Sequence, residues 1–205
     1  MGKVKSERMK VVVFDKMEEC TEAEVQRMLP LVSAQRREQA LKYKHTFGQF
    51  CCLKSWLMLY EMLDEREKGL MDEWEYNEYG KPSFHLSPFT FHLYFSISHC
   101  KAGIAVAIDD APIGIDIETI RHANEDLVER TMNEEERLGI RELGMREFTR
   151  LWTQKEAIVK AEGTGIYSFE QLQTILDNGH WTLDTFEKDN YIYSIAYGQL
   201  CSFGA

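Results

Sequence analysis

The sequence predicts an α+β fold in which each half of the chain supplies one long helix and several antiparallel strands. Two long segments, 50–63 and 146–161, carry apolar residues at the spacing of a helix that buries one face. Short segments rich in β-branched and aromatic residues flank both helices, and turn-forming residues separate them. No low-complexity segment or Pro/Gly/Ser linker divides the chain.

The N-terminal part begins with a predicted strand at 11–14, which has the sequence Val-Val-Val-Phe. Thr21 with Glu24 resembles a capping box, so a short helix should follow it and end before Pro30. Ser33 is a suitable N-cap for the next helix.

The helix predicted at 50–63 has its apolar residues on one face. They are Leu53, Trp56, Leu57, Tyr60 and Leu63. Segment 76–88 is rich in turn-forming residues, and strands are predicted at 91–97 and 104–108 with a turn at 101–103.

The C-terminal half begins with a predicted strand at 113–117. A segment rich in Glu and Arg, 125–143, predicts one or more helices, and helix 146–161 follows it. Three further strands are expected at 171–176, 181–186 and 191–197, with hairpin turns at 177–179 and 188–190.

Composition limits the possible functions. The chain has 205 residues and a net charge of -10, which argues against broad nucleic-acid binding because phosphate neutralisation needs excess Lys and Arg. No apolar run reaches the roughly 18 residues of a membrane span. The five cysteines lack metal-ligand spacing, so we interpret them as reduced thiols of a cytoplasmic protein.

Two segments contain the residues that predict chemistry. In the strand Gly114-Ile115-Asp116-Ile117-Glu118, the two carboxylates point to the same face. In the helix that follows Trp152, Glu156 and Lys160 are four residues apart and share a face. Three carboxylates and a lysine that converge would bind a hard cation beside a phosphate, as in a phosphoryl-transfer centre.

Four blocks, in this order along the chain, resemble the 4′-phosphopantetheinyl transferases, specifically the larger type that activates carrier proteins of peptide and polyketide synthases. The blocks are Gly80-Lys81-Pro82, Phe95-Ser96-Ile97-Ser98-His99-Cys100, the G-I-D-x-E motif at 114–118, and the W-[ST]-x-K-E-[AS]-x-x-K motif at 152–160 with its trailing Glu162-Gly163-Thr164-Gly165-Ile166. The resemblance covers residues 75–166 well and the flanks weakly.

The resemblance implies both a fold and an activity. The fold would be two similar halves, 1–108 and 109–205, related by a pseudo-twofold axis in one compact unit with the active site between them. The activity would transfer 4′-phosphopantetheine from coenzyme A to a serine of an apo acyl or peptidyl carrier protein, releasing adenosine 3′,5′-bisphosphate. We expect a monomer with no nucleic-acid or membrane partner.

For the predicted site, Asp116, Glu118 and Glu156 are the expected Mg²⁺ ligands, because Mg²⁺ takes carboxylate, phosphate and water oxygens. Lys160 would lie against the diphosphate of coenzyme A as a point charge. Without the resemblance, two exposed strand carboxylates and a solvated helix pair would be the favoured explanation of these residues.

Further coenzyme A contacts are implied by the other blocks. Ser98 and His99 would reach the 3′-phosphate, and Lys81 would contact a phosphate, although glycine and proline alone explain a turn there. A basic stretch could hold phosphates or an acidic carrier protein; it comprises Arg36, Arg37, Lys42, Lys44 and His45.

The serine proton needs a base. Glu156 is the first candidate, acting directly or through a bound water, and Glu136 is the second, in a block (131–136) that lacks the family's two aromatic residues. Trp152 is expected in the core, and Lys155 has no assigned role.

Two other functions are compatible with parts of this pattern. A Mg²⁺-dependent nuclease also uses strand carboxylates and a lysine, but the net charge disfavours it. A non-catalytic carrier-protein-binding module would be expected to lose a ligand or the lysine, and all four groups are present.

Overall fold

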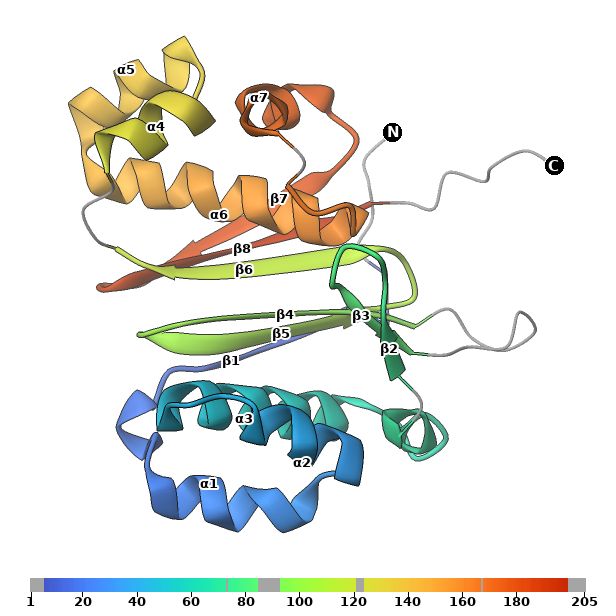
Figure 1. The fold of residues 1–205 in the computed structure, drawn as a ribbon. Coiled ribbons are helices and arrows are strands. Elements are labelled where there is room, and N and C mark those ends of the chain that lie inside the picture. The colour runs from blue at the N-terminus through green and yellow to red at the C-terminus, as the bar shows by residue number, and fades with distance from the viewer. Residues whose placement is uncertain (1–5, 73, 85–92, 121–123, 167, 199–205) are drawn as a thin grey trace, which may run out of the picture.

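Two three-stranded antiparallel sheets lie one above the other, and helices cover the outer side of each (Figure 1). The computed structural model describes residues 6–72, 74–84, 93–120, 124–166 and 168–198. The strands are β1 (Lys10–Phe14), β2 (Trp74–Tyr76), β3 (Pro82–Phe84), β4 (Tyr94–Cys100), β5 (Gly103–Asp109), β6 (Ile113–Thr119), β7 (Thr182–Glu187) and β8 (Tyr191–Tyr197). The α-helices are α1 (Glu22–Met28), α2 (Ala34–Leu41), α3 (Thr46–Met62), α4 (Glu125–Thr131), α5 (Glu134–Leu143), α6 (Met145–Glu162) and α7 (Phe169–Thr174).

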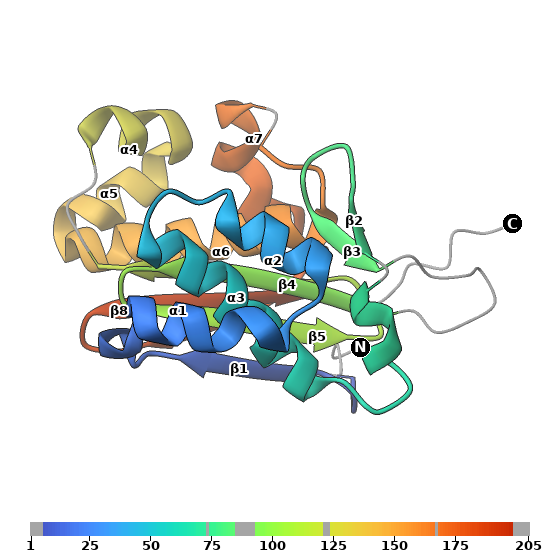
Figure 2. The same cartoon turned by 60° about the horizontal axis from the view of Figure 1, so that its bottom comes forward.

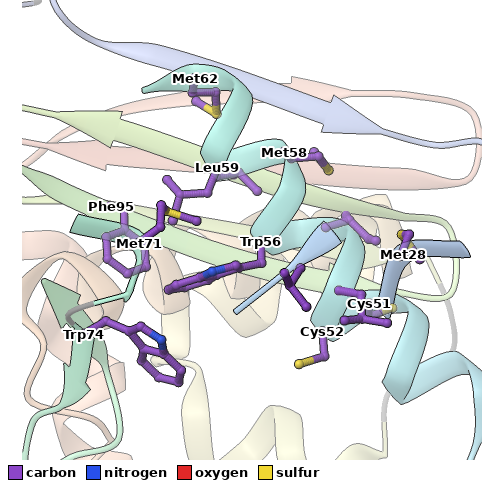
Figure 3. Close-up of a cluster of buried hydrophobic side chains, with 14 of the residues drawn as sticks. Met28, Cys51, Cys52, Trp56, Met58, Leu59, Met62, Met71, Trp74 and Phe95 are labelled. Carbon is purple, nitrogen blue, oxygen red and sulfur yellow. The ribbon is translucent and has the colours of Figure 1, made fainter. Parts of the chain in front are cut away.

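The first sheet has the order β1-β5-β4, and α1, α2 and α3 lie over its outer face (Figure 2). Alternate residues of β5 pack in opposite directions, as the period of a strand requires. Ile104, Val106 and Ile108 join the core under α3, while Ala105 and Ala107 face the second sheet. The core under α3 is rich in large and sulfur-containing side chains, including Met28, Cys51, Trp56, Leu59 and Phe95 (Figure 3).

The second sheet has the order β6-β8-β7, and α6 packs against β6 and β8. Helices α4, α5 and α7 lie on the far side of α6 (Figure 1). On β6, Ile113, Ile115 and Ile117 face the first sheet, so the alternate residues face α6.

The two sheets meet along β4 and the free edge of β6. The Ser96 hydroxyl accepts a hydrogen bond from Ile115 N at 3.0 Å, and the Ser98 hydroxyl accepts one from Ile117 N at 3.3 Å. These side chains therefore satisfy amides on the outer edge of β6 in the described sheet β6-β8-β7.

The predicted α+β class and most predicted elements are confirmed. Thr21 and Ser33 are N-caps, accepting hydrogen bonds from Glu24 N and Arg36 N. The first long helix begins at Thr46, four residues earlier than predicted. The pseudo-twofold relation between the halves stays a prediction, and the predicted positions 85–88 and 91–92 lie outside the described residues.

The predicted strand at 171–176 is wrong. This segment forms α7 and a following 3-10 helix, Ile175–Asn178. Ser168 caps α7 by accepting a hydrogen bond from Gln171 N at 3.2 Å, and Leu172 is buried beneath it. Gly179 then ends the 3-10 helix with φ 61°, so 177–179 is not a hairpin turn. The hairpin turn predicted at 188–190 does join β7 to β8.

Candidate functional site

The candidate site is built where α6 packs on β6, next to the adjoining strand β4. Gly114 makes this crossing possible, because a Cβ atom there would lie 1.9 Å from the Ala157 carbonyl oxygen and 2.4 Å from Ala161 N. Asp116 and Glu118 alternate with the inward isoleucines and so share the α6 face with Gly114, as predicted. The close contact brings Glu156 and Lys160 of α6 toward the two strand carboxylates.

Asp116 is the centre of a compact polar cluster. Its Oδ1 accepts hydrogen bonds from Lys160 Nζ at 2.6 Å and from the Ser98 hydroxyl at 2.7 Å. Lys160 Nζ also donates to Ser98 Oγ at 2.9 Å. The structure thus brings together three residues from separate elements, β4, β6 and α6, each of which was predicted as a site residue.

Glu156 lies in an environment that disfavours its charged form. Burial and then the negative charge of Asp116 raise its pKa from 4.5 to about 7. The positive charge of Lys160 lowers the pKa of Glu156, and the negative charge of Glu118 raises it further. The three predicted ligands therefore interact electrostatically, as a shared cation site requires.

The raised pKa of Glu156 predicts a pH-dependent stability of the metal-free protein. Because the folded state binds this proton more tightly, the group's favourable contribution is complete below pH 4.5 and is lost as pH rises through about 7. The loss should be on the order of 2 kcal/mol. We expect Glu156→Gln to gain stability relative to wild type between pH 5 and pH 8, measured by urea unfolding. A difference that does not change with pH would contradict this.

The residues suit Mg²⁺ chemically, although in the described ranges no three His, Cys, Asp or Glu side chains are already arranged as a metal site. Asp116 Oδ2 is buried and has no hydrogen-bond partner. An oxygen-seeking divalent cation would satisfy this atom and offset the repulsion between Asp116, Glu118 and Glu156. In the structure the Lys160 ammonium forms an ion pair with Asp116.

Lys81 lies in the β2–β3 hairpin, which packs against the end of α6. Its Nζ donates to the carbonyls of Lys160 at 2.6 Å and Ala161 at 3.3 Å, and burial lowers its pKa to about 8. In the same hairpin, Asn77 Nδ2 donates to the Gly163 carbonyl at 2.8 Å. Sequence reasoning missed this capping role, since the partners lie about 80 residues away in the chain.

A pocket of about 380 Å³ lies between this hairpin, β4 and α6. Its walls combine apolar side chains with three ionisable groups, Lys81, Glu156 and Lys160. The apolar lining includes Tyr79, Pro82, Ile97, Val159 and Ile166. An anionic ligand with an apolar or heterocyclic part could therefore place its charge beside Lys160 and the carboxylates.

His99 is exposed beside the cluster, with its ring centroid 6.0 Å from that of Phe47 at the start of α3. Partial desolvation and then the Lys160 charge lower its pKa, and Asp116 opposes them. The charges of Lys160 and Asp116 therefore act on the His99 ring.

The predicted basic stretch does not act as one surface. Arg36 is buried, donates to the Cys52 carbonyl and lies 4.3 Å from the ring centroid of Trp56, so it belongs to the core. Arg37 donates to the Leu29 carbonyl. The other three residues of the stretch, Lys42, Lys44 and His45, are exposed.

Glu136 lies in a different environment from the predicted site. Its Oε2 accepts hydrogen bonds from Asn133 N at 2.8 Å, within a capping box of α5, and from Lys155 Nζ at 2.7 Å. Trp152 packs against the core, as predicted, and also stacks on Phe148. The sequence analysis predicted neither this capping box nor the link of Glu136 to Lys155.

Comparisons with known proteins agree with the motifs. The sequence model of the 4′-phosphopantetheinyl transferase superfamily matches residues 112–197. The chain is 36% identical over 95 residues to the 4′-phosphopantetheinyl transferase gsp of Aneurinibacillus migulanus, covering 44% of this chain and 38% of that protein.

Two other relatives match over longer regions. A 4′-phosphopantetheinyl transferase of Bacillus subtilis is 30% identical over 150 residues, or 70% of this chain and 65% of that protein. The 4′-phosphopantetheinyl transferase AcpT of Salmonella typhi is 33% identical over 132 residues, which cover 60% of this chain and 65% of that protein. The chain therefore spans less than two thirds of the length of these three curated relatives.

Proposed function

Since the chain belongs to the 4′-phosphopantetheinyl transferase superfamily, we propose that it transfers phosphopantetheine from coenzyme A to a carrier protein. The acceptor is a serine hydroxyl of an apo acyl or peptidyl carrier protein, and the second product is adenosine 3′,5′-bisphosphate. The observation that carries this proposal is the cluster of Asp116, Glu156 and Lys160 at one end of the pocket.

In this proposal the three carboxylates Asp116, Glu118 and Glu156 hold Mg²⁺. When bound, the ion neutralises the coenzyme A diphosphate and so allows an oxygen nucleophile to approach it. Lys160 adds a positive charge on the same side, and it is already held in place by Asp116 and Ser98.

Glu156 accepts the serine proton, directly or through a water molecule. The hydroxyl oxygen forms a bond to the phosphorus that bears the pantetheine arm, and the bond from this phosphorus to the oxygen of adenosine 3′,5′-bisphosphate breaks. In the metal-free protein burial and Asp116 raise the pKa of Glu156 to about 7. A carboxylate that binds Mg²⁺ is a poorer base, so the route through a water molecule suits a Glu156 that also holds the ion. The rigid helix α6 fixes the carboxylate relative to the cluster.

Coenzyme A would lie in the pocket, with its diphosphate next to Lys160 and Glu156. His99 is the proposed contact of the 3′-phosphate, since it lies beside Lys160 at the surface. Lys81 forms one wall of the pocket and keeps α6 in position, so its contribution to phosphate binding would come from its charge at the α6 terminus.

The decisive experiment incubates the protein with candidate apo-carriers, coenzyme A and Mg²⁺, and measures intact carrier mass. We expect one phosphopantetheine group to be added to the carrier, only when both coenzyme A and Mg²⁺ are present. In the same assay, His99→Ala should weaken the use of coenzyme A more than that of dephospho-coenzyme A. An equal loss of activity with coenzyme A and with dephospho-coenzyme A would show that His99 does not contact the 3′-phosphate.

The alternatives give different results in this assay. Cleavage of DNA with Mg²⁺ and no carrier modification would indicate a nuclease. Carrier binding without any mass change, at several Mg²⁺ concentrations, would indicate a non-catalytic binding module.

A further inference from the structure

The Lys155 ammonium lies in the protein interior, where four helices meet. Its side chain is 0% exposed. Nζ donates to the Thr131 carbonyl at 3.1 Å, to Glu136 Oε2 at 2.7 Å and to the Leu172 carbonyl at 2.6 Å. A lysine ammonium has three donors, and each of them finds an acceptor here. One side chain of α6 thus holds the end of α4, the first turn of α5 and the body of α7.

Burying this ammonium costs more free energy than burying an apolar side chain of similar size. Desolvation lowers the Lys155 pKa, and the hydrogen bond and negative charge of Glu136, followed by the charge of Asp177, oppose this shift. Replacement of buried ion pairs by apolar residues is often neutral or stabilising, so stability alone is a weak explanation for the pair. A directional, fully satisfied set of hydrogen bonds fixes geometry more strictly than an apolar contact does.

Lys155 directly precedes Glu156 in α6. Successive helical residues point about 100° apart, so Lys155 faces α4, α5 and α7 while Glu156 faces the candidate site. On the other side of Glu156, the backbone of Ala157 packs against Gly114 of β6. The position of Glu156 is therefore fixed by one contact on each side of it.

We propose that Lys155 is a positioning residue that sets the rotation of α6 and so places Glu156 beside Asp116. This inference rests on the proposed function, because it assigns Lys155 a part in the same reaction. Lys155 itself does not touch the reacting atoms; it acts through the three helices that it holds.

The test compares Lys155→Met with two control variants. Lys155→Met should lower kcat by about 10- to 100-fold while the KM for coenzyme A changes less than about twofold, because orientation is lost and binding is kept. The rise in melting temperature that Mg²⁺ alone causes in wild type should also shrink. Glu142→Gln, which changes an exposed carboxylate of α5, should retain near-wild-type kcat.

Ile140→Ala is the control for stability, since Ile140 is buried on α5 in the neighbouring core. It should lower the melting temperature without the fall in kcat. An equal fall in kcat for Ile140→Ala, or wild-type kcat for folded Lys155→Met, would overturn the proposal.

A double variant covers the case in which Lys155→Met does not fold. Lys155→Met/Glu136→Leu removes both charges, and low kcat in this folded protein supports positioning, whereas wild-type kcat overturns it. If wild type transfers nothing, the proposed function fails, and the Mg²⁺-induced melting shift alone then decides the role of Lys155.

Discussion

Replacing Asp116 or Glu156 by alanine is expected to lower phosphopantetheine transfer at least about 100-fold while the protein still folds. Both carboxylates face the same cluster, and each would help to hold the Mg²⁺ that offsets the negative charge of the diphosphate. The measurement is the initial rate of carrier modification at saturating coenzyme A and Mg²⁺. Glu142→Ala is the matched control, because Glu142 is an exposed carboxylate of α5. Near-wild-type turnover in either cluster variant would remove that residue from the site.

The two variants should differ in stability. Asp116→Ala leaves the Lys160 ammonium and the Ser98 hydroxyl without their acceptor, so the melting temperature should fall. Glu156→Ala removes a carboxylate that burial and Asp116 disfavour, so the metal-free protein should lose little stability at pH 8. A fall in activity without a fall in stability identifies Glu156 as a functional residue.

The base is identified by conservative changes. Glu156→Gln keeps an oxygen ligand and loses the proton acceptor, so turnover should collapse even at saturating Mg²⁺. Glu136→Gln can still accept hydrogen bonds from Asn133 and Lys155 and should largely keep its activity. The reverse ranking would make Glu136 the base.

Gly114→Ala is expected to destabilise the fold by about 3 kcal/mol or more. The added methyl would overlap backbone atoms of Ala157 and Ala161, which cannot move aside as a flexible side chain can. Since β6 carries Asp116 and α6 carries Glu156, separation of the two elements would also disrupt the site. For a chain of this size the loss corresponds to a fall in melting temperature of roughly 6–12 °C.

Two variants complete this test. Gly69→Ala should change the melting temperature little, because nothing lies within 4 Å of a Cβ at that position. Ala157→Gly should not rescue Gly114→Ala, because the clash involves the carbonyl oxygen and not the alanine methyl. A Gly114→Ala protein that melts within about 2 °C of wild type would refute the close contact.

Local sequence signals predicted much of the fold and of the cluster. Thr21 and Ser33 marked helix starts, and the spacing of Asp116 and Glu118 on a strand and of Glu156 and Lys160 on a helix placed them correctly on shared faces. These patterns depend on residues within a few positions of one another, so a single sequence reveals them.

The sequence-based predictions fail where contacts with residues far away in the chain determine the structure. The 171–176 segment has strand-like apolar residues, but its Ser168 cap and the burial of Leu172 against other helices favour a helix. Lys155 and Arg36 look like surface residues in the sequence. Each is buried because partners 16–24 residues away in the chain satisfy its charge or its donors. No local pattern signals such partners.

The serine hydroxyls that bond to β6 also bear on aggregation. An edge strand with free amides can recruit a strand from another molecule. Ser96 and Ser98 cover the Ile115 and Ile117 amides from the opposite sheet, which leaves β1 and β7 as the outer strands of the described sheets. Any change that parts the two sheets would uncover an apolar edge strand of three isoleucines. Heating such variants should therefore yield insoluble assemblies, so their unfolding is best studied in urea at low protein concentration.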